Sequence, residues 1–163
     1  MKVRKGELKD IDTIMDIYAP ARKYMVEHGN PDQWADGHPP RELILDDIEK
    51  GICHVITKDD KICGVFAFIL GQDPTYKVIE GGSWLNDNPY GTIHRIASDN
   101  KTGGILKCAI SYGLSHISDV RIDTYKDNIK MQTLLKQYGF TKCGTIYLEN
   151  GDPRIAYHYT SQQ

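Results

Sequence analysis

The most informative segment of the chain spans residues 92–106 and reads Thr92-Ile93-His94-Arg95-Ile96-Ala97-Ser98-Asp99-Asn100-Lys101-Thr102-Gly103-Gly104-Ile105-Leu106. Its pattern predicts a strand, a loop with two adjacent glycines, and a helix. The start of a helix offers free backbone N–H groups and a partial positive charge, and glycines let that backbone approach a phosphate closely. The segment is therefore a candidate phosphate-binding turn, although an ordinary strand-to-helix turn has the same pattern. Neither the Walker pattern nor the dinucleotide G-x-G-x-x-G pattern occurs in it.

Hydrophobic periodicity on either side of this segment predicts the other elements. Predicted helices cover Leu8–His28, Arg41–Lys50, Ile105–His116 and Asn128–Tyr138. Pro20 interrupts the first of these, which predicts a kink or a division into two helices. Predicted strands cover Cys53–Thr57, Ile62–Leu70, Tyr90–Ala97, Val120–Thr124, Phe140–Leu148 and Arg154–Tyr159, the last two as a hairpin.

Residues 71–89 are rich in Gly, Pro, Asn and Asp and predict a long loop, with a short strand at Tyr76–Glu80. Long ordered loops in compact domains are often functional. The predicted order is strand, helix, helix, three strands, helix, strand, helix, two strands. This mixture indicates an α/β architecture in which helices cover a sheet.

Composition narrows the class of protein. The chain has 163 residues, 20 Lys and Arg, 22 Asp and Glu, and 40% hydrophobic residues, which predicts a single globular domain over residues 1–163. A net charge of −2 argues against a nucleic-acid partner. The longest apolar run, Ile62–Leu70, is too short to span a membrane, and the first residues lack a signal-peptide pattern. We therefore expect a cytoplasmic protein with no membrane partner.

The four cysteines Cys53, Cys63, Cys108 and Cys143 form no C-x-x-C motif. We expect reduced thiols that pack as small apolar side chains. His54 follows Cys53, but no second ligand pair stands at a usable spacing, so no metal site is expected.

The glycine segment resembles motif A of the GNAT superfamily of acyl-CoA N-acyltransferases. In this chain the match runs from Ile96 through the turn to Lys101-x-x-Gly104-x-Leu106. Lys101 replaces the usual Arg or Gln. Leu106 replaces the usual small residue, and its larger side chain is expected to crowd the start of the helix.

A second segment carries the same resemblance. GNAT members usually have Asn-x-x-Ala-x-x-Leu-Tyr-x-x-x-Gly-Phe on the helix after the fifth strand, and here Asn128, Leu134, Gly139 and Phe140 match. Leu135 stands where the family often has the tyrosine that protonates the leaving thiolate. Tyr138 lies on another helical face and is not expected to take that role.

The region from Met25 to Trp34, and Asp123-Thr124 with Asn128, are similar to one branch of uncharacterised bacterial acetyltransferases. The resemblance implies a mixed central sheet with helices on both faces, whose fourth and fifth strands splay apart. It implies acetyl-CoA as co-substrate and no metal.

The resemblance also implies which residues hold the co-substrate. The backbone of Ile96 and Ser98 is expected to bind the pantetheine arm, and Asn128 to reach that arm or the catalytic centre. The pyrophosphate is expected on the N–H groups of Lys101, Thr102, Gly103, Gly104, Ile105 and Leu106.

The implied reaction needs a group that removes a proton from the attacking amine, because an alkylammonium has a pKa of about 10. Strand alternation places Tyr90, Thr92, His94 and Ile96 on one face. His94 is a candidate base and also a candidate structural histidine. Glu80 is a second candidate base or a solvated loop carboxylate. Tyr90 is a candidate proton donor to the thiolate or a packing residue.

Two loop tryptophans, Trp34 and Trp84, are candidates for the wall of the acceptor site, with anchoring of their loops as the alternative. The tyrosines of the last predicted strands suggest sheet packing or the surface of a homodimer.

Taken with the resemblance, these features predict an acetyl-CoA-dependent N-acetyltransferase that acts on a primary amine of a small molecule or peptide. The amine attacks directly in a ternary complex. One alternative is a CoA-binding GNAT-like module without turnover, acting as a sensor or interaction protein, which Leu106 and Leu135 favour. Another is an unrelated α/β phosphate-binding protein.

Overall fold

The structure is a computed structural model that describes residues 1–162. Its centre is a seven-stranded mixed sheet in the order β1-β2-β3-β4-β5-β7-β6. The strands are β1 (Lys2–Lys5), β2 (Cys53–Lys58), β3 (Lys61–Leu70), β4 (Gly91–Ser98), β5 (Asp119–Thr124), β6 (Thr141–Tyr147) and β7 (Pro153–Thr160). The α-helices are α1 (Ile11–Glu27), α2 (Arg41–Glu49), α3 (Ile105–Leu114) and α4 (Ile129–Gln137). The predicted α/β class and element order are confirmed.

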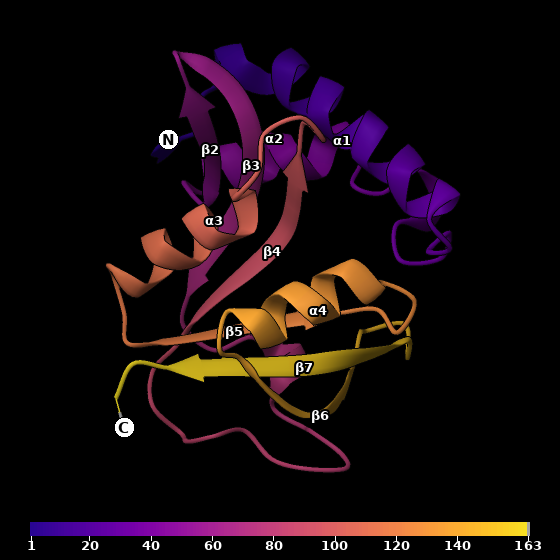
Figure 1. Cartoon of the computed structure of the whole chain (residues 1–163), viewed down its shortest axis with the longest axis vertical. Helices are drawn as coiled ribbons and strands as arrows, with labels where there is room; N and C mark the ends of the chain where they lie inside the picture. The colour runs from indigo at the N-terminus through magenta and orange to yellow at the C-terminus, as the bar shows by residue number, and fades with distance from the viewer. Residues whose placement is uncertain (163) are drawn as a thin grey trace.

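The helices cover both faces of the sheet (Figure 1). Against α3 and α4, the sheet contributes Ile93, Ile122 and Tyr157 to the largest buried cluster. A second cluster lies under α1 and α2 and includes Ile14 and Ile44, both fully buried. Each helix buries one apolar stripe, as its period predicts.

The sheet opens between β4 and β5. These two strands are parallel and pair only at Gly91 with Val120 and Thr92 with Arg121. Beyond that point β4 pairs with β3 while β5 pairs with β7, and the strands diverge (Figure 1). Both strand edges in the gap therefore keep backbone groups that are not used in the ladder.

A β-bulge in β4 changes which side chains face each side of the sheet. Val65 pairs with Ala97 but Ala67 pairs with His94, so β4 contains one extra residue there. Arg95, in this bulge, has a φ of 51°. Ile96 consequently packs on the α3 side with Ile93. The prediction that Ile96 shares a face with His94 is wrong, because simple alternation ends at the bulge.

Two further predictions differ from the structure: the division into two helices that is one alternative at Pro20, and the short strand at Tyr76–Glu80. The chain does not form two helices around Pro20, since α1 continues through it. Pro20 is exposed, so water can bind the carbonyl group that loses its helical partner. The segment Tyr76–Glu80 is not a strand: Pro74–Tyr76 form a 3-10 turn, and only Glu80 pairs, in a single bridge with Thr145.

The four cysteines are free thiols, and all but Cys108 are buried. None of the helices among residues 1–162 combines the length and the apolar character needed to cross a membrane. Within the same residues, no group of His, Cys, Asp or Glu side chains is arranged to hold a metal ion.

Candidate active site

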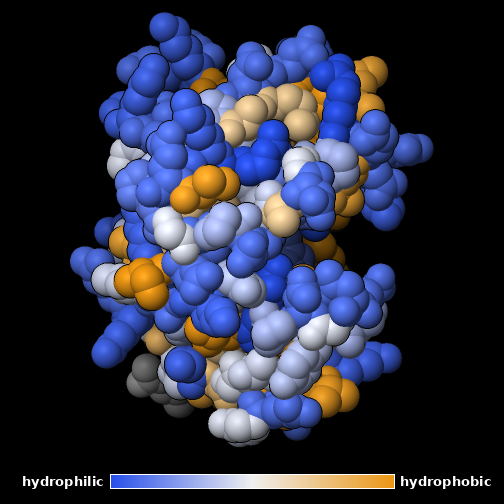
Figure 2. Space-filling view, turned by 90° about the vertical axis from the view of Figure 1, so that its right-hand side faces the viewer, coloured by the Kyte–Doolittle hydropathy of each residue, from blue (hydrophilic) through white to orange (hydrophobic). Residues whose placement is uncertain are grey.

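Two cavities lie where β4 and β5 part. The first, which we call the helix cavity, has a volume of about 510 Å³ and is bounded by α1, the β4–α3 loop and α4. The second, which we call the acidic cavity, has a volume of about 670 Å³ and is bounded by β4, β5 and the segments 32–38 and 148–154. Met25, Ile96, Asn128 and Met131 line both. Seen from the open side of the sheet, the surface is largely hydrophilic and hollowed between its two halves (Figure 2).

The glycine turn forms one end of the helix cavity. Gly104 precedes α3 with a φ of 80°, a left-handed conformation that glycine adopts without strain. Gly103, Gly104, Ile105 and Leu106 line the cavity. The first N–H groups of an α-helix have no partner within it, so those of α3 are available to an anion.

The beginning of the turn is organised differently from the prediction. The Asp99 carboxylate accepts hydrogen bonds from the N–H groups of Lys101 (2.9 Å) and Thr102 (2.8 Å). Burial opposes ionisation of Asp99, but these hydrogen bonds outweigh it and lower the pKa of its carboxyl. The N–H groups of Lys101 and Thr102 are therefore occupied, and the Lys101 side chain is absent from the cavity lining. The predicted anion site is reduced to residues 103–106 and the start of α3.

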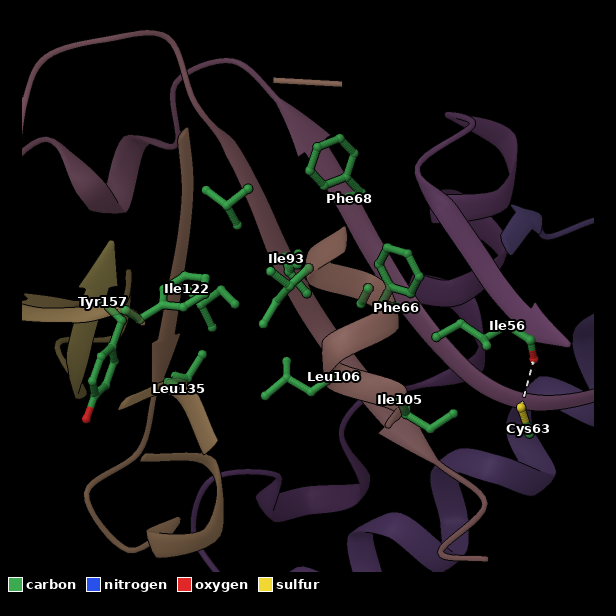
Figure 3. Close-up of a cluster of buried hydrophobic side chains, with 14 residues drawn as sticks. Ile56, Cys63, Phe66, Phe68, Ile93, Ile105, Leu106, Ile122, Leu135 and Tyr157 are labelled. Carbon is green, nitrogen blue, oxygen red and sulfur yellow. Dashed lines mark hydrogen bonds between the residues drawn. The ribbon is translucent and has the colours of Figure 1, made fainter. Parts of the chain in front are cut away.

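The two leucines that depart from the family pattern both point into the core. Leu106 and Leu135 belong to the buried cluster beneath α3 and α4, and Figure 3 shows them near Ile93 and Ile122. The core holds most of the Leu106 side chain, which also lines the helix cavity, so the expected crowding of the turn stays a prediction. Leu135, fully buried, reaches neither cavity lining.

Tyr138 does line the helix cavity, together with Met131 and Leu134 on the same stripe of α4. It follows Asn128 by ten residues, which is about 15 Å along a helix. It is therefore remote from the junction of the cavities.

Asn128 stands at that junction. Its side-chain oxygen accepts from the Met131 N–H (3.1 Å) and caps α4, while its NH₂ group donates to Gln33 (3.0 Å). Gln33 also accepts from Asn30 (2.8 Å), so amide groups join the segment after α1 to the start of α4. Ser98 lines the helix cavity, and its hydroxyl accepts from the Asn100 N–H (3.0 Å).

His94 lies between two carboxylates in the acidic cavity. Its Nε2 is 2.9 Å from Asp73, and its Nδ1 is 4.0 Å from Asp123. Burial would raise the pKa of Asp73, but hydrogen bonds from His94 and Thr75 outweigh burial and lower it to about 2. Asp73 therefore stays ionised and orients the imidazole.

Asp123 has the opposite character. Burial raises the pKa of its carboxyl, and the electrostatic effects of His94 and Arg154 offset this only in part. Its side chain is 10% exposed and lines the acidic cavity. Such an environment makes Asp123 a group that favours a cationic partner.

Side chains from α1 and α2 stabilise the β4 bulge that orients His94. The Tyr18 hydroxyl donates to the Arg95 carbonyl at 2.6 Å. The Arg95 side chain forms a bidentate ion pair with the buried Asp47 of α2. These contacts fix a backbone conformation that arginine adopts at a cost.

Of the two tryptophans predicted for the acceptor site, one lines a cavity and the other does not. Trp34 is buried, stacks edge-on with Tyr18 and lines the acidic cavity. Trp84 lines neither cavity and donates to the Tyr76 carbonyl (2.9 Å), with the Arg121 guanidinium over its ring. It anchors the long loop.

Glu80 and Tyr90 also lie outside both cavity linings. Glu80 is exposed and accepts from the Tyr147 hydroxyl at 2.9 Å. Tyr90 is buried, and its hydroxyl accepts from the Asp73 N–H at 2.8 Å. Their positions support the alternatives of a loop carboxylate and a packing residue.

Sequence reasoning missed Asp73 and gave Asp123 and Gln33 no chemical role. Asp73 precedes Pro74 and caps the 3-10 turn, a pattern that the Asp-Pro pair signals. Nothing local indicates that its second oxygen meets His94, which comes from a strand 21 residues later.

Comparison with known proteins places this chain in a family. No family model matches the chain, and no curated protein matches it. A GNAT-family acetyltransferase structure from Streptococcus agalactiae is similar at 36% identity, covering 99% of this chain and 96% of its own, with a TM-score of 0.88.

Two further structures share the fold at lower identity. A putative acetyltransferase from Staphylococcus aureus has 21% identity over 98% of this chain and 99% of its own, with a TM-score of 0.70. A GNAT-family acetyltransferase from Listeria monocytogenes has 20% identity over 98% of this chain and 94% of its own, with a TM-score of 0.71. The splayed sheet, the glycine turn and the 36% identity together show that this chain belongs to the GNAT family of acetyltransferases.

Proposed function

We propose that the protein transfers the acetyl group of acetyl-CoA to a primary amine of a small molecule or peptide, by direct attack in a ternary complex. One observation carries the proposal: two cavities meet at the gap between β4 and β5 and share Met25, Ile96, Asn128 and Met131. A donor in one cavity and an acceptor in the other would have their reacting atoms side by side.

The helix cavity has features that suit acetyl-CoA. Free N–H groups at the start of α3 suit a pyrophosphate, and Gly103 and Gly104 leave room for its approach. The unpaired edge of β4 beyond Thr92 suits the amides of the pantetheine arm and offers N–H groups to the thioester oxygen. Because the chain carries a net charge of only −2, this attraction is local.

The acidic cavity has features that suit the acceptor. An alkylammonium loses its proton with a pKa of about 10, so it needs a nearby base. His94 takes that role, and Asp73 acts as a positioning residue through its 2.9 Å contact. The amine nitrogen then bonds to the acetyl carbon, the carbon–sulfur bond breaks, and the leaving CoA thiolate takes up the second proton, which the acylated nitrogen loses.

Binding and turnover test the proposal separately. Acetyl-CoA at a hundredfold excess over its Kd should stabilise the fold by about 2.7 kcal/mol, seen as a rise in melting temperature. Thiol release and product mass are then followed across a panel of primary amines. Absence of a thermal shift with both acetyl-CoA and CoA contradicts the proposal. A shift without turnover on any amine indicates a non-catalytic CoA-binding module.

A further inference from the structure

The charges that line the acidic cavity are unevenly divided. Six of the chain's 22 acidic residues line it, but only two of its 20 lysines and arginines do. The acidic residues are Asp32, Asp36, Asp73, Asp123, Glu149 and Asp152, and the basic ones are Arg95 and Arg154. With the histidines neutral, the wall of this cavity is more acidic than the protein as a whole.

Three of these charged side chains already interact with other groups of the protein. Arg95 is neutralised by Asp47, which lies outside the cavity lining. Arg154 is buried, donates to the Pro153 carbonyl and lies over the Tyr125 ring, and its positive charge partly offsets the effect of burial on the pKa of Asp123. Asp73 is engaged by His94. The remaining five carboxylates are therefore those that a ligand can meet.

Asp123 is the innermost of these carboxylates. Its side chain is 10% exposed, and His94 Nδ1 is 4.0 Å away. The buried Tyr76 hydroxyl is the neighbouring donor, and it forms no hydrogen bond of normal length. A buried carboxylate left in this state is costly, and an ammonium group would satisfy it.

The other four carboxylates are exposed at the mouth of the cavity. Asp32 and Asp36 lie between α1 and α2, and Glu149 and Asp152 lie in the β6–β7 turn. Figure 1 shows these two segments at the open side of the molecule, one in each half. Within residues 1–162, none of the four forms an ion pair with a lysine, arginine or histidine, because the ten ion pairs found there all involve other carboxylates.

Apolar side chains line the acidic cavity together with these carboxylates. Trp34, Ile93, Ile122, Met131 and Leu148 line the same cavity. The wall thus combines one buried carboxylate, several apolar side chains and four exposed carboxylates. That combination complements two ammonium groups joined by a chain of methylenes.

We infer that the acceptor is an aliphatic diamine or polyamine, whose acetylated nitrogen lies beside His94 and Asp123 and whose second ammonium is held by the carboxylates at the mouth. This inference rests on the proposed function for the reaction, but it also predicts binding that does not depend on turnover.

Calorimetry with CoA present tests the binding, using 1,4-diaminobutane, spermidine, n-butylamine and 4-aminobutyrate. The diamine and the triamine should bind about tenfold tighter than butylamine, and 4-aminobutyrate should bind more weakly than butylamine. This preference should shrink in 1 M NaCl, where the Debye length falls to about 3 Å.

Removing the exposed carboxylates of the acidic cavity tests where the second ammonium group binds. Glu149→Gln/Asp152→Asn and Asp32→Asn/Asp36→Asn should each weaken diamine binding about five- to tenfold and leave butylamine binding unchanged. The control, Asp59→Asn/Asp60→Asn, removes the same charge in the β2–β3 turn, outside both cavities, and should have no effect. An effect of the control as large as that of the mouth variants contradicts the proposed location.

Equal affinity for diamine and monoamine overturns the inference, as does a lysine-rich peptide that binds more tightly than every diamine. Preferential diamine binding without acetylation of any amine supports the inference and contradicts the proposed function. Acetylation of monoamines and diamines with equal kcat/KM supports the function and contradicts the inference.

Discussion

The Arg95 guanidinium donates two hydrogen bonds to the Asp47 carboxylate, from Nε at 2.9 Å and from Nη2 at 3.0 Å. This pair joins α2 to the bulge of β4, and the Tyr18 hydroxyl joins α1 to the same residue at its carbonyl oxygen. At the bulge, His94 points into the acidic cavity, while Ile96 packs against the buried cluster on the α3 side of the sheet. Residues distant in sequence from the reacting groups therefore determine the direction of the candidate base.

Removing Asp47 should destabilise the protein and misplace His94. Asp47→Ala leaves the largely buried Arg95 charge without its partner, which typically costs about 3 kcal/mol. We expect a lower urea midpoint and a reduced kcat. Asp46→Ala is the matched control, because Asp46 pairs with Lys50 at the surface. A midpoint shift no larger than that of the control would show that the ion pair does not support the bulge.

Removing the imidazole of His94 should slow the reaction without preventing donor binding. His94→Ala is expected to lower kcat about 100-fold, because it removes the group that accepts the amine proton. The Kd for CoA should stay the same, since His94 lies in the acidic cavity and not in the helix cavity. Steady-state rates and calorimetry measure the two effects. A rate within a factor of two of the parent excludes His94 as the base.

Asp73 should make stability depend on acid pH. Its pKa is lowered to about 2 in the folded protein from an ordinary 3.8, so its ionised form stabilises the fold by about 2 kcal/mol. This contribution is present above pH 4 and is lost as the pH falls toward 2. Urea midpoints of the parent and Asp73→Asn should differ most at pH 6 and converge only near pH 2. A difference that stays constant with pH contradicts this assignment.

Two substitutions at Gly104 separate backbone strain from charge. Gly104→Ala should cost about 1 kcal/mol of stability because its φ is 80°, but it should leave CoA binding nearly intact. Gly104→Glu adds a negative charge at the start of α3 and should abolish CoA binding by repulsion and bulk. Calorimetry with CoA measures both. Retained affinity in Gly104→Glu would show that phosphate binds elsewhere.

The two hydrogen bonds of Asn128 can be separated as well. Asn128→Ala removes the cap of α4 and should cost about 1 kcal/mol of stability. Asn128→Asp retains the capping oxygen but loses the NH₂ group that donates to Gln33. Its stability should approach that of the parent, while acetyl transfer is impaired in both variants. Thermal melts and initial rates distinguish the effects, and equal activity in all three proteins would exclude Asn128 from the site.

The regular part of the fold could be predicted because burial is periodic in each helix and strand. The glycine turn before α3 and the cap at Asn128 are also local patterns, and both line the helix cavity. The bulge could not be predicted, because Tyr18 and Asp47 maintain it from distant helices. Alternation along β4 therefore placed Ile96 on the wrong face.

The roles of loop residues also could not be predicted, because they depend on contacts with distant parts of the chain. Trp34 and Trp84 are both tryptophans in loops, yet only Trp34 lines a cavity. Their different roles depend on which surfaces the loops meet, and Trp84 meets Tyr76 and Arg121. Asp73 meets His94 by the same kind of long-range contact, so its identity as a positioning residue required the folded structure.

The wall shared by the two cavities has a thermodynamic consequence. Met25, Ile96, Asn128 and Met131 would contact both bound ligands, so ordering these side chains for one ligand changes the free energy of binding the other. The coupling is reciprocal: any factor by which the donor raises affinity for the acceptor is the factor by which the acceptor raises affinity for the donor. Both orders of arrival then release the same total free energy. A preferred order in the kinetics would report which opening is easier to enter, and not which ligand binds more tightly.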